Sequence, residues 1–272
     1  MSDFYRFTIL GCGSSAGVPR PNGFWGACNP NNPKNKRYRT SLLVQRIQQC
    51  DQKTTVIIDT GADFRSQMLD MHVENLNAAI YTHFHADHTH GIDDLRSYAL
   101  AQKCLINIYA DTFTLKHLNK SFEYCFQTSR GSNYSPILKA HPIEEESKFI
   151  IQGKGGAIIF SAHPQLHGSI HSLGFRIGNV AYCTDVNHFP EKALLNLMNL
   201  DVLIIDALQF KPHVSHFSVD QALHWINYLK PKKAILTHMD NSLDYDEVMK
   251  YVPSNVEPAY QGLTFETDVI ES

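Results

Sequence analysis

Residues 82–88 read Thr82-His83-Phe84-His85-Ala86-Asp87-His88, and this run is the strongest indication of the fold. It begins at the end of an apolar segment, residues 78–82, that predicts a buried strand. His83 and His85 are two positions apart, so on an extended segment their side chains point to the same side. Four potential ligands directly after a buried strand indicate a concave metal site at the edge of a sheet. They are His83, His85, Asp87 and His88.

A single histidine is more often a polar surface group than a metal ligand. The spacing H-x-H-x-D-H after a hydrophobic strand makes that interpretation a poor one here, because it meets the needs of a bound ion. Imidazole and carboxylate ligands together favour zinc, manganese or iron over calcium or magnesium.

The composition of the 272-residue chain is that of an ordinary globular protein, with 43% hydrophobic and 19% charged residues. Its length fits one large domain or two small ones, and we expect a single hydrolase domain over residues 1–272. The formal net charge of −3 disfavours nucleic-acid binding by broad phosphate neutralisation, although a local basic patch stays open.

No secretory signal and no run of roughly 18 apolar residues is evident, so we expect no membrane association. The six cysteines are scattered without a C-x-x-C pair, which predicts reduced thiols and a cytoplasmic protein. They are Cys12, Cys28, Cys50, Cys104, Cys125 and Cys183. A homodimer stays open.

Strand and helix patterns alternate along the chain and predict a mixed α+β fold. Strands are expected at residues 7–10, 41–44, 55–59, 78–82, 148–151, 157–161, 173–177, 180–184, 202–206 and 234–237. Helices are expected at residues 61–72, 93–102, 190–198 and 219–229, and residues 121–139 read as a polar, irregular middle. Strands in both halves suggest two packed sheets with helices outside.

The run T-H-x-H-x-D-H resembles the defining motif of the metallo-β-lactamase superfamily, and the resemblance spans nearly the whole chain. It implies an αβ/βα sandwich, two packed mixed β-sheets with helices on the outer faces. It also implies two divalent ions at one edge, zinc or manganese, with iron a further candidate. His83, His85 and His167 are implied for one ion, Asp87, His88 and His238 for the other, and Asp185 is implied as shared.

Two of these positions have competitors. His163 and His171 are neighbours of His167, which alone would read as a loop histidine. Cys183 precedes Asp185 by two residues, in the region where secreted β-lactamases place a cysteine ligand. Asp185 is favoured because a bridging carboxylate suits hard metals, and Cys183 is expected to pack inward.

Asp59 also fits the superfamily pattern, in which this residue hydrogen-bonds to the metal-site loops and orders them. A role as the N-cap of the helix predicted after it is equally compatible with the sequence.

Two neighbouring metal ions can hold a bridging hydroxide and bind phosphate oxygens, which favours hydrolysis of phosphate esters. His216, with Ser218 and Ala222, matches the form H-x-[ST]-x-x-x-A of the phosphodiesterase branches, including tRNase Z. The resemblance implies that His216 contacts a phosphate oxygen or protonates the leaving alkoxide. The alternative is an exposed histidine beside a helix that Ser218 caps. The catalytic residues are therefore expected to be Asp87, Asp185 and His216.

Residues 10–19 and 91–96 resemble the PhnP-like group, which splits cyclic phosphates and related phosphodiesters. Its best-known members carry a C-x-C-x-x-C zinc cluster where this chain has only Cys28. A third, structural zinc is therefore not expected, and the substrate of that group does not carry over. Phe24 and Trp25 either flank a base or sugar or, as the plainer alternative, pack in the core.

We therefore predict a dinuclear-metal phosphodiesterase that cleaves small nucleotide-like or cyclic phosphate esters by a metal-bridging hydroxide. A tRNA 3′-end endonuclease is the first alternative, but it needs a basic arm, and the middle of this chain contains the run Glu144–Glu146. A non-catalytic nucleotide-binding homologue is the second, although every ligand position is filled.

Overall fold

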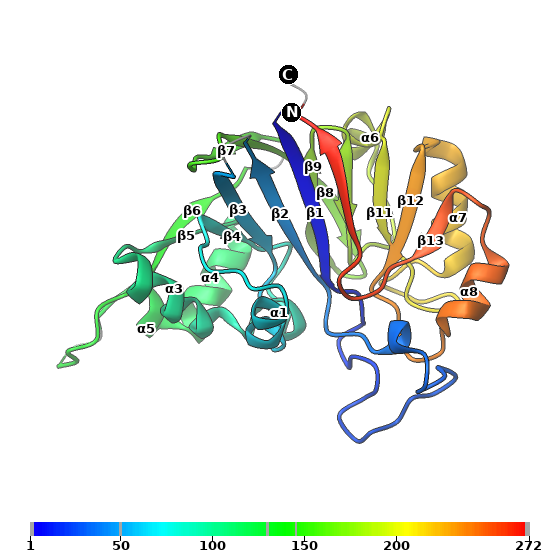
Figure 1. Ribbon diagram of the computed structural model, residues 1–272, viewed down its shortest axis with the longest axis horizontal. Coiled ribbons are helices and arrows are strands. Elements are labelled where there is room, and N and C mark those ends of the chain that lie inside the picture. Colours follow the sequence, from blue (N-terminus) through cyan, green and yellow to red (C-terminus); the bar gives the residue numbers. More distant parts are fainter. Residues whose placement is uncertain (1–2, 49–50, 129–130, 145, 270–272) are drawn as a thin grey trace.

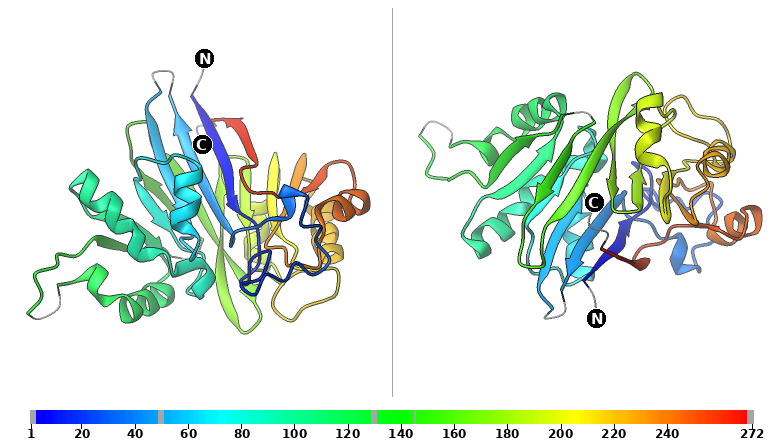
Figure 2. Two further views of the ribbon diagram at one scale, coloured as in Figure 1. Left: turned by 60° about the horizontal axis from the view of Figure 1, so that its bottom comes forward. Right: turned by 90° about the horizontal axis from the view of Figure 1, so that it is seen from above.

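The computed structural model describes residues 3–48, 51–128, 131–144 and 146–269. Within these residues the strands form two seven-stranded sheets that face each other, with helices on both outer faces (Figure 1, Figure 2). The α+β sandwich expected from the sequence is thereby confirmed.

The first sheet has the strand order β14-β1-β2-β3-β4-β5-β6. Its strands β3 to β6 run parallel to one another, and β14, β1 and β2 are antiparallel to their neighbours. The bounds are β1 (Phe4–Gly11), β2 (Ser41–Ile47), β3 (Lys53–Ile58), β4 (Ala78–Ile80), β5 (Ile106–Ala110), β6 (Leu138–Pro142) and β14 (Thr264–Asp268).

The second sheet has the order β13-β12-β11-β10-β9-β8-β7. Here β10 to β13 run parallel, and β7, β8 and β9 are antiparallel. The bounds are β7 (Lys148–Ile151), β8 (Ile158–His167), β9 (Ile170–Ile177), β10 (Val180–Cys183), β11 (Val202–Asp206), β12 (Lys233–Thr237) and β13 (Val256–Pro258).

Helices cover the sandwich on both sides (Figure 1). Those beside the first sheet are α1 (Phe64–Asp70), α3 (Leu95–Gln102), α4 (Thr112–Ser121) and α5 (Glu123–Phe126). Those beside the second are α6 (Glu191–Leu197), α7 (Val219–Leu229) and α8 (Tyr245–Tyr251). The short helix α2 (Ala86–Thr89) and the 3-10 turns η1 (Pro33–Asn35) and η2 (Ile92–Asp94) lie in loops. In the part of the chain that is described, every helix is too short or too polar to cross a membrane.

Alternation along the strands explains why the sheets are covered on both faces. In β2, Leu42 and Val44 are buried in the core between the sheets, together with Phe160 and Phe175 of the opposite sheet. The intervening Leu43 points the other way, into the cluster that includes residues of α1 and α3. Successive strand residues face opposite sides, so apolar residues in succession require a layer on each side.

The prediction for the middle of the chain was wrong. The stretch 121–139 contains α5 and enters β6, and the sequence did not indicate β5, α4 or β6. β6 is an edge strand with exposed Lys139 and Ala140, so it lacks the apolar run of a buried strand. The strand predicted at 157–161 extends as β8 to His167, which makes His167 a strand residue and not a loop residue. α8, β13 and β14 were also not predicted.

Six of the strands that end at one edge of the sandwich, the lower edge in Figure 1, matter for the site. They are β3 and β4 of the first sheet and β8, β10, β11 and β12 of the second. A polar residue stands at or just after the end of each, so this edge collects side chains that are far apart in the sequence. These residues are Asp59, His83, His167, Asp185, Asp206 and His238.

Candidate metal centre

The two sheets deliver the predicted ligands in different ways. His83 and His85 follow β4 directly, and Asp87 and His88 lie on α2, so the first sheet supplies four side chains from one loop. The second sheet supplies three side chains, each from a different strand. They are His167 at the end of β8, Asp185 after β10 and His238 after β12.

Three residues of this edge adopt left-handed backbone conformations. The φ angles are +65° at Asp59, +54° at Asp185 and +58° at His238. This region is uncommon for residues other than glycine and costs free energy, so it persists only where the surroundings enforce it. Each of the three stands where the chain leaves a parallel strand and turns across the edge of the sandwich.

The side chains converge to distances expected around a metal ion. His88 Nε2 lies 3.2 Å from Asp185 Oδ2, and His238 Nε2 lies 3.3 Å from Asp185 Oδ1. Asp87 Oδ2 lies 3.4 Å from His88 Nε2 and 3.6 Å from His238 Nε2. Two ligand atoms about 2.0–2.2 Å from one tetrahedral ion lie roughly 3.3 Å apart, so these separations suit shared coordination.

Of the groups of three potential ligand atoms in the described residues, two match the predicted assignment, each with all its atoms within 4.8 Å of one another. One is His83, His85 and His167, and the other is Asp87, His88 and His238. Asp185 Oδ1 lies 3.9 Å from His83 Nε2 and 3.8 Å from His167 Nε2, so this carboxylate also faces the first group. The structure thus brings together all seven residues predicted as ligands.

Unpaired buried nitrogens test whether these residues fit a cation. Nε2 of His83, of His88 and of His238 are buried without a hydrogen-bond partner in the described parts of the chain. Buried polar atoms are nearly always paired, and each unpaired one calls for an explanation. All three point into the cluster, where a bound cation would accept their lone pairs. The donor set therefore fits divalent metal ions.

The electrostatics of the cluster agree with this fit. Burial, with repulsion from His88, holds the pKa of His83 well below its usual value, which keeps its imidazole neutral as ligation requires. Burial opposes charge on His88 too, but the carboxylates of Asp185, Asp87 and Asp59 outweigh it and raise the pKa of His88 well above the usual value. Three carboxylates around one buried imidazole create a negative potential that favours a bound cation.

Hydrogen bonds behind the cluster fix the orientation of two imidazoles. Asp59 Oδ2 lies 2.7 Å from His88 Nδ1, and its two oxygens also accept hydrogen bonds from Thr82 N and Oγ1, each at 2.8 Å. His167 Nδ1 donates to the carbonyl oxygen of Ser215 at 2.7 Å. A proton held on Nδ1 directs the lone pair of Nε2 toward the cluster. Asp59 does not cap α1, whose N-cap position is occupied by Asp63.

His216 lies against the cluster and is paired with a carboxylate. Its Nδ1 is 2.7 Å from Asp206 Oδ2, and its ring stacks on His238 with centroids 4.7 Å apart. His216 is 8% exposed, so it is not an ordinary surface histidine. Burial opposes its protonation, but Asp206 and Asp185 outweigh this effect and raise the pKa of His216 to about 9. Ser218 caps α7 in a capping box, so the helix cap and the buried histidine coexist.

Asp206 is a site residue that the sequence analysis missed. It accepts hydrogen bonds from His216 and from Val186 N, the latter at 2.9 Å, and it is fully buried. The signal was present, since Asp206 closes the apolar run of β11 as Asp185 and His238 follow β10 and β12.

The competing residues lie elsewhere. Cys183 is buried between the sheets with its Sγ 3.5 Å from His163 Nε2, and burial raises its pKa. Burial also lowers the pKa of His163, to about 3. His171 is exposed on β9. Among the described residues, no cysteine joins a group of potential metal ligands.

The segment before β2 differs from the expectation of core packing. Phe24 is 55% exposed, with the Arg20 guanidinium 5.9 Å from its ring centroid, and Trp25 is half-buried. Cys28 is a buried free thiol. Cys50 lies outside the described residues, and the other five cysteines are free.

Comparisons with known proteins agree on the family. The model of the "Beta-lactamase superfamily domain" matches residues 54–239. A solved structure described as a new diphosphatase from the PhnP family is 30% identical, with a TM-score of 0.87 and 98% of each chain covered. Zn²⁺-bound PqqB from Methylobacterium extorquens is 14% identical, with a TM-score of 0.76, 96% of this chain and 99% of PqqB covered. The short form of human tRNase Z is 15% identical, with a TM-score of 0.67 and coverages of 96% and 98%. The last two share the fold.

A curated relative, octanoyltransferase of Porphyromonas gingivalis, is 28% identical over 262 residues. The match covers 95% of this chain and 51% of the relative, so the chain spans about half the length of that protein. The family model matches more than half of the chain, and the PhnP-family diphosphatase is 30% identical over 98% of each chain. This chain is a hydrolase of the metallo-β-lactamase fold, and it belongs to the β-lactamase superfamily and, within it, to the PhnP family.

Proposed function

We propose that the protein is a phosphodiesterase that uses two divalent ions, zinc or manganese, to cleave small nucleotide-like or cyclic phosphate esters. The observation that carries this proposal is the buried His216–Asp206 pair beside the two groups of predicted ligands. A metal cluster alone serves many hydrolases. The ligand atoms of His216 lie within 4.8 Å of those of His167, Asp185 and His238, but we leave His216 outside the proposed ligand set because its pairing with Asp206 suits a proton donor for an ester.

The proposed ligands follow two of the groups of potential ligands among the described residues. His83, His85 and His167 hold one ion, Asp87, His88 and His238 hold the other, and Asp185 is shared. When bound, the ions would stabilise charge on the phosphoryl oxygens and lower the pKa of a bound water. Asp59 and Ser215 keep the imidazoles of His88 and His167 in place through their Nδ1 atoms.

His216 has the arrangement of a general acid. Asp206 holds its Nδ1, which leaves Nε2 for the substrate. The carboxylate also stabilises the protonated ring, as the raised pKa of His216 indicates. In the proposed reaction His216 Nε2 donates a proton to the leaving oxygen of the ester, or contacts a phosphoryl oxygen.

The relative described as a PhnP-family diphosphatase supports phosphate ester chemistry, because it aligns with 98% of this chain. Octanoyl transfer is not part of the proposal, because the match covers 51% of the protein that carries this name.

Hydrolysis of bis(p-nitrophenyl) phosphate by the metal-loaded protein tests the proposal. On a cyclic nucleotide, whose strongly basic alkoxide leaving group needs a proton, His216→Ala should lower turnover between about a hundredfold and ten-thousandfold, the range for loss of a general acid, with metal content unchanged. His224→Ala, an exposed histidine on α7, is the matched control and should change neither. Parallel loss of metal and turnover would make His216 a ligand, and no wild-type turnover of any phosphodiester would contradict the function.

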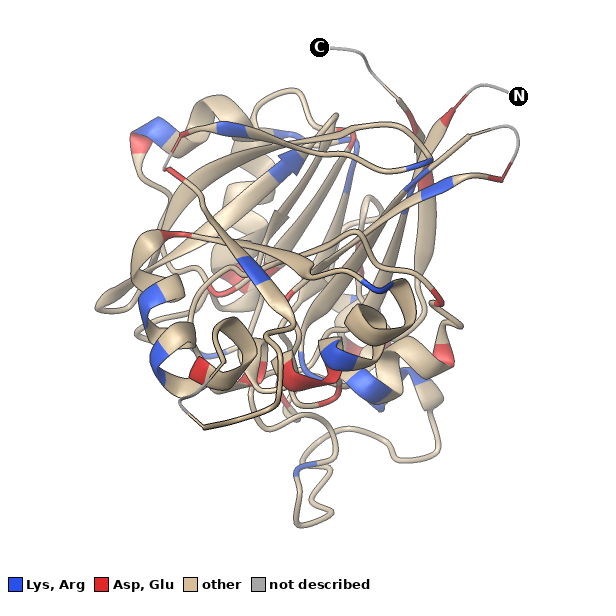
Figure 3. Ribbon diagram, turned by 90° about the vertical axis from the view of Figure 1, so that its left-hand side faces the viewer, with Lys and Arg blue, Asp and Glu red and all other residues tan. Residues whose placement is uncertain are grey.

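Cleavage of precursor tRNA is the second candidate, and the same preparation tests it. The face formed by α3, α4 and α5 shows basic and acidic segments interspersed (Figure 3), and the formal net charge is −3. A protein that grips tRNA through its phosphates would present a basic surface. We therefore expect small phosphodiesters to be cleaved more efficiently than precursor tRNA.

A further inference from the structure

We propose that Phe84, Phe113 and His117 form a subsite for a planar ring. This ring is the nucleobase, or a similar group, on the ester that stays attached to phosphorus when the leaving group departs. We name these three residues the aromatic wall. This inference rests on the proposed phosphodiesterase function and adds to it the residues that contact the ring of a nucleotide-like substrate.

The aromatic wall is joined directly to a predicted metal ligand. Phe84 stands between His83 and His85 in the sequence, and its ring centroid lies 5.0 Å from that of His85. Its ring stacks on His117 at 4.3 Å with an interplanar angle of 21°, and it meets Phe113 edge-on at 5.5 Å. Phe113 and His117 are 4.4 Å apart. Three rings therefore form one continuous surface beside His85.

The start of α4 holds this surface in place. Asp111 caps the helix, accepting hydrogen bonds from Thr114 N at 2.6 Å and from Thr114 Oγ1 at 3.2 Å. His117 Nδ1 donates to the carbonyl oxygen of Phe113 at 2.9 Å. Residues four apart lie on one face of a helix, so the cap and this hydrogen bond fix both rings toward Phe84.

Burial of apolar area does not account for the position of Phe113. Its side chain is 57% exposed, although the ring is held by two neighbours. Single exposed apolar residues are ordinary. Phe113, however, contacts Phe84 edge-on, and Phe84 in turn contacts the imidazole of the predicted ligand His85, so the exposed ring of Phe113 offers a face for a further ring close to the cluster. A nucleobase that stacks there would cover it.

The wall and His216 contact the ligand groups at different residues. His216 meets His167 and His238, with ring centroids 4.6 Å and 4.7 Å away, whereas the wall meets His85. A phosphodiester carries two ester groups in different directions from phosphorus. With its leaving oxygen at His216, the retained group is the one available to the wall.

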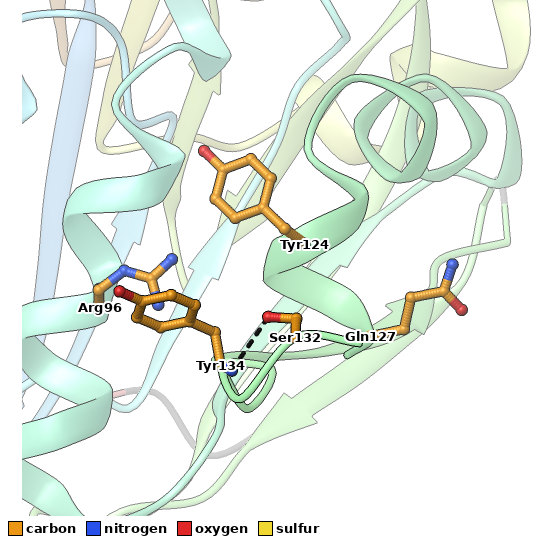
Figure 4. Close-up of a pocket in the computed structure, with 5 residues that line it drawn as sticks. All are labelled: Arg96, Tyr124, Gln127, Ser132 and Tyr134. Carbon is orange, nitrogen blue, oxygen red and sulfur yellow. Dashed lines mark hydrogen bonds between the residues drawn. The ribbon is translucent and has the colours of Figure 1, made fainter. Parts of the chain in front are cut away.

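A cavity of about 340 Å³ is the competing location for a ring (Figure 4). It is lined by Arg96, Tyr124, Gln127, Ser132 and Tyr134. Arg96 is paired with Asp93 at 2.7 Å, and its guanidinium lies 5.9 Å from the centroid of the Tyr124 ring. Among the described residues, none of the five lining side chains is hydrogen-bonded or ring-stacked to a predicted ligand, so the wall is the better candidate.

Two substrates that share a leaving group but differ in the retained group can show whether the ring binds at the aromatic wall or in the competing cavity. The metal-loaded protein is assayed with the p-nitrophenyl ester of thymidine 5′-phosphate and with methyl p-nitrophenyl phosphate, and wild type should prefer the nucleoside ester. Phe113→Ala should lower that preference about tenfold, as expected for loss of one stacking partner, through KM and not kcat. Phe113→Tyr keeps the ring and should keep the preference. Tyr134→Ala, an exposed ring of the competing cavity, is the matched control.

The affinity for thymidine 5′-monophosphate gives a readout without turnover. Calorimetry on the metal-loaded protein should show about tenfold weaker binding to Phe113→Ala, with metal content as in wild type. An unchanged preference in Phe113→Ala, equal losses for both esters, or a lost preference in Tyr134→Ala alone would each overturn the proposal. Wild-type turnover of the methyl ester reports on the phosphodiesterase function separately, and turnover of neither ester would overturn both.

Discussion

The two sheets build one site by opposite means. The first places four predicted ligands on a single loop after β4, so their relative positions depend on local backbone geometry. The second brings His167, Asp185 and His238 from three separate strand ends, so their positions depend on register between strands. A shift in the second sheet would move each of its ligands separately, whereas the loop of the first sheet moves as a unit.

This difference explains where the supporting interactions lie. Asp59 braces the loop of the first sheet through Thr82 and His88. In the second sheet a buried chain supports Asp185 instead, since Gln165 Nε2 donates to Ser172 Oγ at 3.1 Å and to Thr184 O at 2.9 Å. Ser172 Oγ then donates to the Asp185 carbonyl oxygen at 2.8 Å.

The largest effect is expected at the residue where the two sheets meet. Asp185→Ala removes the carboxylate that faces both groups of ligands, so hydrolysis of bis(p-nitrophenyl) phosphate should be abolished while the fold stays intact. Turnover and circular dichroism measure this. Unchanged turnover would rule out the assignment of the site.

Removal of one strand-end ligand should affect one ion only. His167→Ala should reduce the metal content from two ions per chain to one, because we assign His167 as a ligand of one ion only, with His83 and His85. His171→Ala, an exposed histidine of the adjacent strand, should leave the content at two. Loss of metal in both variants, or in neither, would show that β8 does not supply this ligand.

A smaller effect on metal binding is expected from Asp59, whose hydrogen bonds hold the metal-site loop of the first sheet. Asp59→Asn places an amide where His88 Nδ1 needs an acceptor, so metal affinity should fall about 10- to 100-fold, the usual cost of losing such a partner. Titration of the metal-free protein measures the affinity. An affinity equal to that of wild type would mean that the loop is rigid without Asp59.

The smallest effect should come from Ser172, whose hydroxyl supports Asp185 in the second sheet. Ser172→Ala leaves the Asp185 carbonyl oxygen without its hydroxyl donor, which should lower the free energy of unfolding by about 1–3 kcal/mol. Denaturant unfolding of the metal-free protein reports this change. If stability stays the same and only metal affinity falls, Ser172 acts on the position of Asp185 alone.

The four predicted ligands that follow β4 could be recognised from the sequence because they lie close together in it. The spacing of His83, His85, Asp87 and His88 after an apolar strand is visible in one window, and the structure places all four at the same edge. His167, Asp185 and His238 needed the resemblance to a known family, because their proximity arises from strand pairing.

The features that sequence did not indicate depend on contacts between distant residues. The pairing of His216 with Asp206 joins a loop to a strand end, and the stacking of Phe84 on His117 joins the metal loop to α4. α4 itself lies in the region from β5 to β6, where the half-exposed edge strand lacks an apolar pattern. No periodicity reveals such contacts.

Metal analysis of the purified, metal-loaded protein tests the central claim most directly, namely that the two sheets jointly hold two ions through Asp185. Elemental analysis by mass spectrometry should find two zinc or manganese ions per wild-type chain. Fewer than two ions in the wild type, or two in Asp185→Ala, would contradict it.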